Sequence, residues 1–221
     1  MGKSKACSKS ALKVAKSPGE DMKLLYIYGE AGMGKTHLLN SINNYIVENS
    51  KSLKVINITI YNFINNMINS ISNDKNDLFN SEFYNADVLV FDNLQDINGK
   101  ARSLEEFKNI LNIVLAMGKQ VVLESSKPSS EIIINGEKLE SVFEVSVAFQ
   151  LTKPDLNTKI EILKSRIIKE ELLFIADDTI NIIAENVDTN VRELIGAYNK
   201  VVSYSKMVDK KIDRQELLSI I

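Results

Sequence analysis

At positions 29–36 the chain reads Gly29-Glu30-Ala31-Gly32-Met33-Gly34-Lys35-Thr36. This stretch matches the pattern G-x-x-x-x-G-K-S/T, in which glycines let successive backbone N–H groups surround phosphate oxygens. The five residues before it, 24–28, are all apolar or aromatic, and apolar side chains recur at helical spacing over 38–46. Strand, loop and helix in this order are the context that the pattern requires, so we predict a phosphate-binding site.

The end of this loop carries the two side chains that such a site needs. Lys35 is placed to reach the β- and γ-phosphates of a nucleotide, and the Thr36 hydroxyl can ligate Mg²⁺. The start of the following helix adds partial positive charge. We predict that ATP or ADP, with Mg²⁺, is bound by Gly29, Glu30, Ala31, Gly32, Met33, Gly34, Lys35, Thr36 and His37, although a histidine at the start of a helix more often has a structural role.

Composition narrows the class of protein. The chain has 221 residues, of which 44% are hydrophobic and 25% charged, which is ordinary for a globular protein. Its formal net charge of −2 provides no global attraction to nucleic acid. No apolar run approaches the roughly 20 residues that span a bilayer, and the basic N-terminus lacks the apolar stretch of a secretory signal. With one cysteine and no Cys/His cluster, we expect a cytoplasmic protein without membrane contact or a metal cluster.

Apolar segments alternate with amphipathic ones through the first two thirds of the chain. We predict strands over 24–28, 53–59, 87–92, 120–126 and 146–151, and helices over 5–17, 36–49, 63–73, 76–84 and 103–117. Ser103 and Glu106 form the capping-box pattern that would start the last of these helices. Near-continuous apolar strands separated by helices predict an α/β fold with a parallel sheet covered on both faces.

The pattern changes after Lys153-Pro154-Asp155 to helices alone. We predict helices over 156–173, 178–187, 190–208 and 213–220, with Asn190 and Glu193 as a second capping box. The sequence therefore predicts a nucleotide-binding α/β core over residues 1–154 and a small all-α domain over residues 155–221.

The strand over 87–92 ends in an acid that suits the second half of a nucleotide site. A carboxylate at the carboxyl end of a strand beside the loop can hold Mg²⁺ through water, so we assign this role to Asp92. The next residue is Asn93, where many P-loop ATPases have an acid. Because an amide can hydrogen-bond a water but cannot take its proton, we predict slow hydrolysis of ATP.

Taken together, these segments resemble the AAA+ domain of the DnaA family, the bacterial chromosomal replication initiators. Residues 24–39 are similar to that family's phosphate loop, including His37, and residues 86–95 to its Walker B segment. Residues 120–123 resemble its sensor 1 strand, and residues 191–197 its sensor 2 helix. The resemblance extends from about Ala11 to the C-terminus. It implies a three-layer sandwich with strand order 5-1-4-3-2, a helical lid, and Arg192 reaching the phosphates from that lid.

The chain also departs from this family at functional positions. Asn93 replaces the second Walker B acid, Ser126 replaces an Asp on the sensor 1 strand, and Val142 aligns with the arginine finger. We therefore expect catalytic activity at Asp92, Asn93 and Ser126 to be weak or absent. On this resemblance we also expect the chain to lack the family's origin-reading helix-turn-helix module and its N-terminal helicase-contacting domain.

The segment 61–84 occupies the sequence position of the family's initiator-specific insert, but it lacks the basic residues of that insert. Its only cation is Lys75, which is outnumbered by Asp74, Asp77 and Glu82. Since phosphate neutralisation supplies most non-specific affinity for DNA, we expect DNA binding to be weak or indirect. We predict that the aromatic residues of this segment belong to the core: Tyr61, Phe63, Phe79, Phe83 and Tyr84.

Three functional interpretations remain open. In the first, the chain is a nucleotide-binding DnaA-like protein of replication initiation or its regulation, which docks on an initiator or another AAA+ subunit. In the second, it is a fragment of an active replication initiator ATPase that lacks its origin-DNA-binding domain. In the third, it is a helicase-loader-type ATPase.

Overall fold

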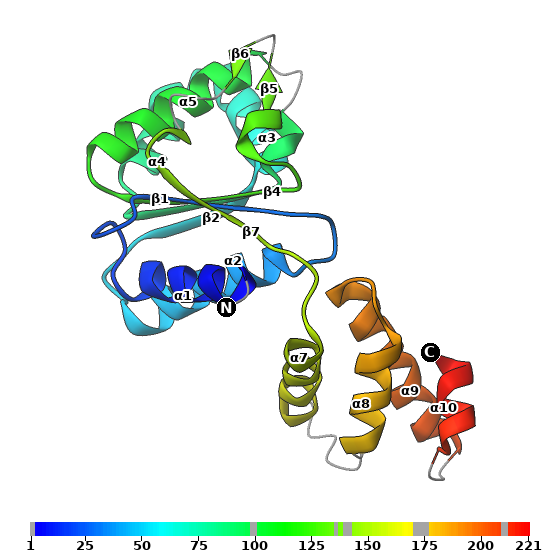
Figure 1. Ribbon diagram of the computed structural model, residues 1–221. Helices are drawn as coiled ribbons and strands as arrows, with labels where there is room; N and C mark the ends of the chain where they lie inside the picture. Colours follow the sequence, from blue (N-terminus) through cyan, green and yellow to red (C-terminus); the bar gives the residue numbers. More distant parts are fainter. Residues whose placement is uncertain (1–2, 98–100, 135–136, 139–142, 170–176, 209–211) are drawn as a thin grey trace. The chain divides into compact units, whose positions relative to one another are not determined.

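The computed structural model describes residues 3–97, 101–134, 137–138, 143–169, 177–208 and 212–221. The chain divides into two compact units (Figure 1). The first is formed by Met1–Glu30 and Lys35–Leu151, and the second by Ala31–Gly34 and Thr152–Ile221.

A parallel sheet forms the centre of the first unit. Its strands are β1 (Leu24–Tyr28), β2 (Val55–Thr59), β3 (Val88–Asp92), β4 (Gln120–Ser125) and β7 (Ser146–Gln150). They lie in the order β2-β3-β4-β1-β7 with every pairing parallel, which confirms the predicted order. The three inner strands are buried along almost their whole length, whereas the two edge strands are partly exposed. The apolar runs of the three inner strands thus reflect a position in which both faces are covered.

Helices cover both faces of this sheet (Figure 1). On one face lie α1 (Lys3–Lys16) and α2 (Lys35–Asn49), and on the other lie α3 (Ile60–Ser72), α4 (Asn76–Tyr84) and α5 (Ala101–Ala116). The predicted start of the last helix at Ser103 is wrong, because α5 begins two residues earlier, with the strong helix formers Ala101 and Arg102. The carboxylate of Glu106 accepts a hydrogen bond from Asn80 Nδ2 at 2.7 Å.

Aromatic rings fill the space between the sheet and α3, α4 and α5. The ring of Phe63 lies 5.3–5.7 Å from four other rings, those of Phe79, Phe83, Phe91 and Phe107. These phenylalanines are buried, as the sequence predicted for those of the insert. The prediction is wrong for Tyr61, which is 59% exposed. It lies at the second position of α3, away from the sheet-facing stripe that Ile60, Phe63 and Ile64 form.

Four short elements were not predicted. These are the 3₁₀ turns η1 (Leu94–Ile97) and η2 (Ser129–Glu131) and the antiparallel pair β5 (Ile133–Ile134) and β6 (Glu137–Lys138). Strands of two residues are too short to show a period in the sequence, which explains why the pattern did not reveal them. The position predicted to replace the arginine finger, Val142, lies outside the described residues.

The second unit is helical and contains α7 (Leu156–Lys169), α8 (Asp177–Asn186), α9 (Val191–Val208) and α10 (Arg214–Ile220). Its core is apolar and centres on Leu163, Ile183 and Tyr198, none of which is exposed. Lys159 is 8% exposed and its ammonium donates hydrogen bonds to the carbonyls of Ala184 at 3.3 Å and Val187 at 2.7 Å. It thereby satisfies backbone acceptors at the end of α8.

One half of the capping box predicted for the long helix α9 is present as predicted, and the other half joins the two side chains instead of a side chain and the backbone. Asn190 Oδ1 accepts a hydrogen bond from the backbone N–H of Glu193 at 2.9 Å, and the two side chains also bond to each other at 3.1 Å. The predicted helix over 156–173 extends to Lys169 within the described residues.

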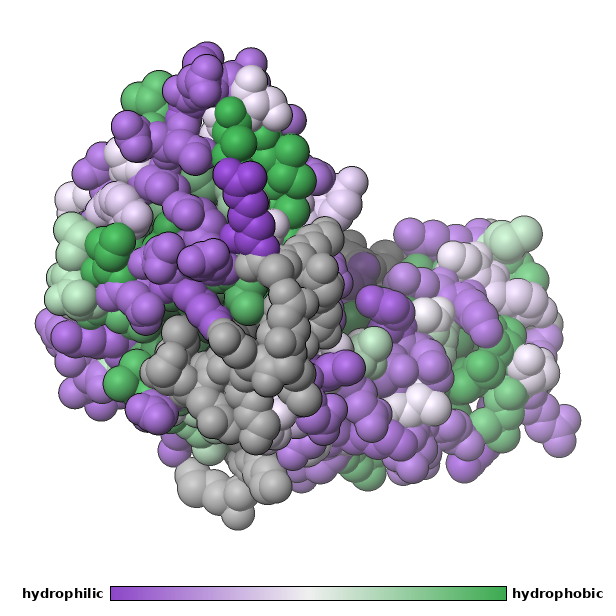
Figure 2. All heavy atoms as spheres, turned by 90° about the horizontal axis from the view of Figure 1, so that it is seen from above, coloured by the Kyte–Doolittle hydropathy of each residue, from purple (hydrophilic) through white to green (hydrophobic). Residues whose placement is uncertain are grey.

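The surface drawn in Figure 2 is mostly hydrophilic, with hydrophobic side chains interspersed. In the part of the chain that the structure describes, every helix is too short or too polar to cross a membrane. The single cysteine, Cys7 on α1, is fully buried, and this burial raises the pKa of its thiol to about 11. A thiol in this environment stays protonated and chemically inert at neutral pH.

Candidate functional site

The phosphate loop leaves β1 at a position that only glycine can occupy. A Cβ atom on Gly29 would lie 2.3 Å from the carbonyl oxygen of Leu151. The backbone N–H of Gly29 donates to the carbonyl of Ser125 at 3.2 Å. This first glycine of the motif therefore allows the loop to start in the narrow space between the end of β4 and Leu151, which follows β7.

Lys35 is the first residue of α2 and is 7% exposed. Its ammonium donates a hydrogen bond to the carbonyl of Glu30 at 3.0 Å and forms an ion pair with Glu124 Oε1 at 3.1 Å. A buried ammonium costs free energy unless it is paired. These two contacts therefore stabilise the charged end of the Lys35 side chain in its position beside the N-terminus of α2.

Thr36 and Asp92 also lie together, as the sequence predicted for a Mg²⁺ site. Thr36 Oγ1 lies 3.5 Å from Asp92 Oδ1, and Asp92, at the end of β3, is 8% exposed. A hydroxyl and a carboxylate oxygen are hard donors of the kind that Mg²⁺ prefers, so these residues fit the ion. Among the described residues there is no group of three or more His, Cys, Asp or Glu side chains that could hold a metal ion.

Asn93 follows β3 in a left-handed conformation, with φ of 60°. Its backbone N–H donates to Asp92 Oδ1 at 3.1 Å and to Glu124 Oε2 at 2.9 Å. Its side-chain oxygen accepts a hydrogen bond from Gln95 Nε2 at 3.2 Å. The Gln95 oxygen in turn accepts from the Ser125 hydroxyl at 3.0 Å and from the backbone N–H of Ser126 at 2.9 Å. The amide of Asn93 and the exposed Ser126, which follows β4, are thus joined by one neutral network.

Glu124 is a residue of this site that no sequence motif predicted. It lies on β4, is 2% exposed, and contacts both Lys35 and the backbone N–H of Asn93. The pKa of its carboxyl is raised to about 7, mainly because burial penalises the charged form and because the Asp92 carboxyl lies beside it. The hydrogen bond from the Asn93 N–H and the charge of Lys35 act in the opposite direction and limit this rise. One signal could have revealed it, since an acid is unusual in a strand with so many apolar residues.

The middle of the phosphate loop is grouped with the helical unit. Within that unit, the carbonyl of Gly32 accepts a hydrogen bond from the backbone N–H of Arg192 at 3.2 Å, and a Cβ on Gly32 would lie 2.6 Å from Asn190 Oδ1. The side chain of Arg192 is exposed at the second position of α9. His37 is exposed on α2, and its carbonyl accepts from the Ser41 hydroxyl at 2.8 Å.

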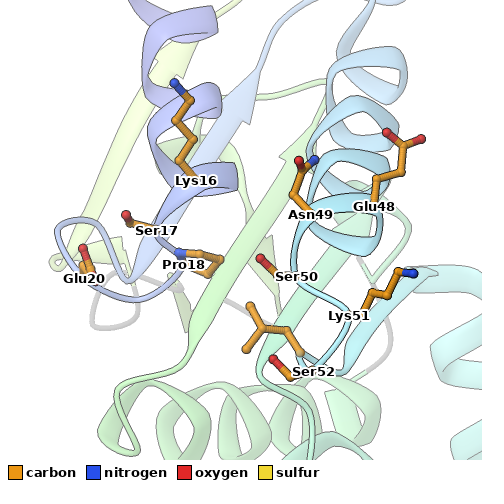
Figure 3. Close-up of a pocket in the computed structure, with 10 residues that line it drawn as sticks. Lys16, Ser17, Pro18, Glu20, Glu48, Asn49, Ser50, Lys51 and Ser52 are labelled. Atoms are coloured by element: carbon orange, nitrogen blue, oxygen red, sulfur yellow. The ribbon is translucent and has the colours of Figure 1, made fainter.

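An open pocket of about 670 Å³ lies elsewhere on the first unit (Figure 3). It is lined by the last turns of α1 and α2 and the segments that follow them, with Lys16, Glu20, Glu48 and Lys51 as its charged residues. Because α2 has 15 residues and Lys35 is its first, this pocket is about 22 Å along the helix from the lysine. Helix C-termini carry partial negative charge, so this pocket does not favour a phosphate.

Comparison with known proteins gives consistent matches. Residues 1–150 match the family model described as the bacterial DnaA ATPase domain. The chain is 37% identical over 204 residues to the chromosomal replication initiator protein DnaA of Caldanaerobacter subterraneus subsp. tengcongensis, covering 92% of this chain and 46% of that protein. It thus spans about half the length of this curated relative.

Solved structures give the same result. Domain III of the Thermotoga maritima replication initiation protein DnaA superposes with a TM-score of 0.88 at 32% identity, covering 98% of this chain and 90% of that one. A replication initiator DnaA bound to AMPPCP and single-stranded DNA matches with a TM-score of 0.76 at 26% identity, covering 90% of this chain and 60% of that one.

Proposed function

Because this chain belongs to the family of the bacterial DnaA ATPase domain, we propose that it binds ATP or ADP with Mg²⁺ and acts in DNA replication initiation or its regulation. The observation that carries this proposal is the arrangement of Lys35, Thr36 and Asp92 at the start of α2 and the end of β3. An ammonium beside the loop and two hard oxygen donors are the groups that a Mg²⁺–nucleotide requires. Binding of AMPPCP by a solved relative supports the same ligand class.

Each part of the loop has a role in this proposal. Lys35 would neutralise the β- and γ-phosphates, and backbone N–H groups from Gly29 to Thr36 would donate to phosphate oxygens. Thr36 and, through water, Asp92 would hold Mg²⁺, which lowers the negative charge of the phosphates when it is bound. Residues 155–221 would form a lid from which Arg192 contacts the phosphates.

Nucleotide binding is tested by thermal unfolding. ATP and ADP are each expected to raise the melting temperature in Mg²⁺, because a ligand that binds only the folded state stabilises it. Lys35→Ala should abolish this rise, whereas Lys108→Ala, on α5, should leave it unchanged. The absence of a shift with both nucleotides would refute the proposal.

We also propose that hydrolysis is slow. The support is the neutral side chain of Asn93, which bonds to Gln95 and has no charge with which to activate a water. Asn93→Asp is expected to raise the steady-state rate of phosphate release. Rapid turnover by the unmodified protein would contradict this part of the proposal.

Contact with DNA is proposed to be weak, and contact with an initiator or another AAA+ subunit to be the main interaction. In the insert, Lys75 is the one cation, and Asp74, Asp77 and Glu82 surround it in sequence. Fluorescence anisotropy with labelled single-stranded DNA at physiological salt is expected to show weak binding. Tight binding would instead favour the role of an active initiator, since a DnaA relative has been solved with single-stranded DNA.

A further inference from the structure

The carboxylate of Glu124 lies at the carboxyl end of the sheet, where ligands bind in open parallel α/β folds. β4 is flanked by β1, which leads into the phosphate loop, and by β3, which ends in Asp92. In register, Glu124 pairs with Ile27 near the end of β1. The topology thus places this acid between the two strands that carry the proposed nucleotide-binding groups.

The Glu124 carboxylate contacts the side chain of Lys35 and the backbone that follows Asp92. One carboxylate oxygen lies 3.1 Å from Lys35 Nζ, and the other accepts the N–H of Asn93 at 2.9 Å. The same N–H also donates to Asp92 Oδ1 at 3.1 Å, so the carboxylates of Glu124 and Asp92 share one donor. In such sites the lysine reaches the terminal phosphates and the aspartate serves Mg²⁺. A carboxylate that pairs with this lysine and shares a donor with this aspartate therefore lies beside the position of the transferred phosphoryl group.

Packing does not explain the presence of this acid. Its neighbours on β4, Val121, Val122 and Leu123, are fully buried and apolar. A carboxylate in such a strand costs free energy relative to an apolar residue, even when it is paired. A charged residue in an otherwise apolar stretch of a buried strand, in contact with a predicted phosphate-binding group, is a candidate for a functional role.

We propose that Glu124 supplies the carboxylate that orients and polarises the attacking water in ATP hydrolysis, in place of an acid at position 93. This inference rests on the proposed binding of ATP. In the step, the water oxygen forms a bond to the γ-phosphorus, and the bond from that phosphorus to the β,γ-bridging oxygen breaks, its electron pair leaving with ADP. Both protons of the water end on the released phosphate, one of them on the oxygen that the water supplied. Asn93 contributes its backbone N–H, which holds the Glu124 carboxylate in place.

The test compares three variants with the unmodified protein loaded with Mg²⁺ and radiolabelled ATP. Glu124→Gln keeps the shape and removes the charge, Glu124→Asp keeps the charge on a shorter side chain, and Glu48→Gln is the matched control on the exposed surface of α2. Hydrolysis is followed in a single turnover over hours. Separately, the affinity for ATP is measured by calorimetry, and the nucleotide that remains bound is identified by chromatography.

Glu124→Gln is expected to lower the single-turnover rate about 10²-fold, the order of loss that a misplaced reactant causes. It should bind ATP at least as tightly as the unmodified protein, since Lys35 is released from its carboxylate partner, and ATP rather than ADP should be recovered from it. The Asp variant should be intermediate in rate, and the Glu48 variant unchanged.

Three results would overturn the proposal. These are an unchanged rate in Glu124→Gln, a fall in rate matched by an equal fall in ATP affinity, and no measurable hydrolysis by the unmodified protein. Failure of the unmodified protein to bind ATP would instead refute the proposed function itself.

Discussion

Replacing Glu124 with glutamine should change how the stability of the nucleotide-free protein depends on pH. The carboxyl is 2% exposed, and its pKa is raised from an ordinary 4.5 to about 7. At about 1.4 kcal/mol for each pKa unit, this rise corresponds to about 3 kcal/mol.

The sign of this pH dependence of stability follows from whether the folded or the unfolded state binds the Glu124 proton more tightly. Because the folded state has the higher pKa, Glu124 stabilises the fold when both states are protonated, below about pH 4.5. This contribution is lost as the pH rises through about 7. The glutamine variant has no proton to lose, so its stability relative to the unmodified protein should increase with pH by about 3 kcal/mol in total. Most of this change should develop between pH 5 and pH 8.

The measurement is urea unfolding of both proteins, followed by far-UV circular dichroism, without nucleotide and with EDTA, at several pH values. The difference between the two free energies of unfolding removes the contribution of ionisable groups that do not interact with Glu124. Glu48→Gln, whose side chain is exposed, serves as the control and should show no such trend. If the free energies of unfolding of Glu124→Gln and the unmodified protein differ by the same amount at every pH, the argument that burial raises the pKa of the Glu124 carboxyl is refuted.

Three further substitutions test other parts of the structure. Phe63→Ala removes a fully buried ring that contacts four others, so chemical denaturation should show a loss of about 3–5 kcal/mol. Gly29→Ala places a Cβ 2.3 Å from the Leu151 carbonyl, so calorimetry should show weakened ATP binding; an unchanged affinity would mean that the loop start is not fixed as described. Lys159→Met removes the donor to two carbonyls at the end of α8, so the melting temperature should fall, as expected for a loss of about 1–3 kcal/mol, while an unchanged value would show that water satisfies these carbonyls equally well.

The sequence predicted the centre of the sheet well because its three inner strands are buried on both faces. Runs such as 24–28 and 88–91 leave no amphipathic alternative, and the phosphate-loop pattern fixes which strand precedes which helix. The strand order came from the family resemblance and is confirmed. The helix start at Ser103 was wrong because a local capping pattern does not register whether the residues before it are also helical.

The candidate site was only partly visible in the sequence. Lys35 and Thr36 are adjacent to the glycines and Asp92 ends a strand, so their types and spacing predicted the groups that now lie together. Glu124 carries no such pattern, since its importance arises from β4 lying between β1 and β3. That neighbourhood depends on which strands pair, and the pairing brings together residues about 90 positions apart in the chain, as between Lys35 and Glu124.

The burial of Cys7 has a practical consequence for measuring motion in this protein. With its only native thiol enclosed in the first unit, the chain can receive maleimide dyes at newly introduced cysteines without removal of the native one. Met207, which is 84% exposed on α9, and Val47, which is 52% exposed on α2, offer one attachment point in each unit. A donor–acceptor pair at these positions would report the separation of the units by energy transfer, with and without ATP.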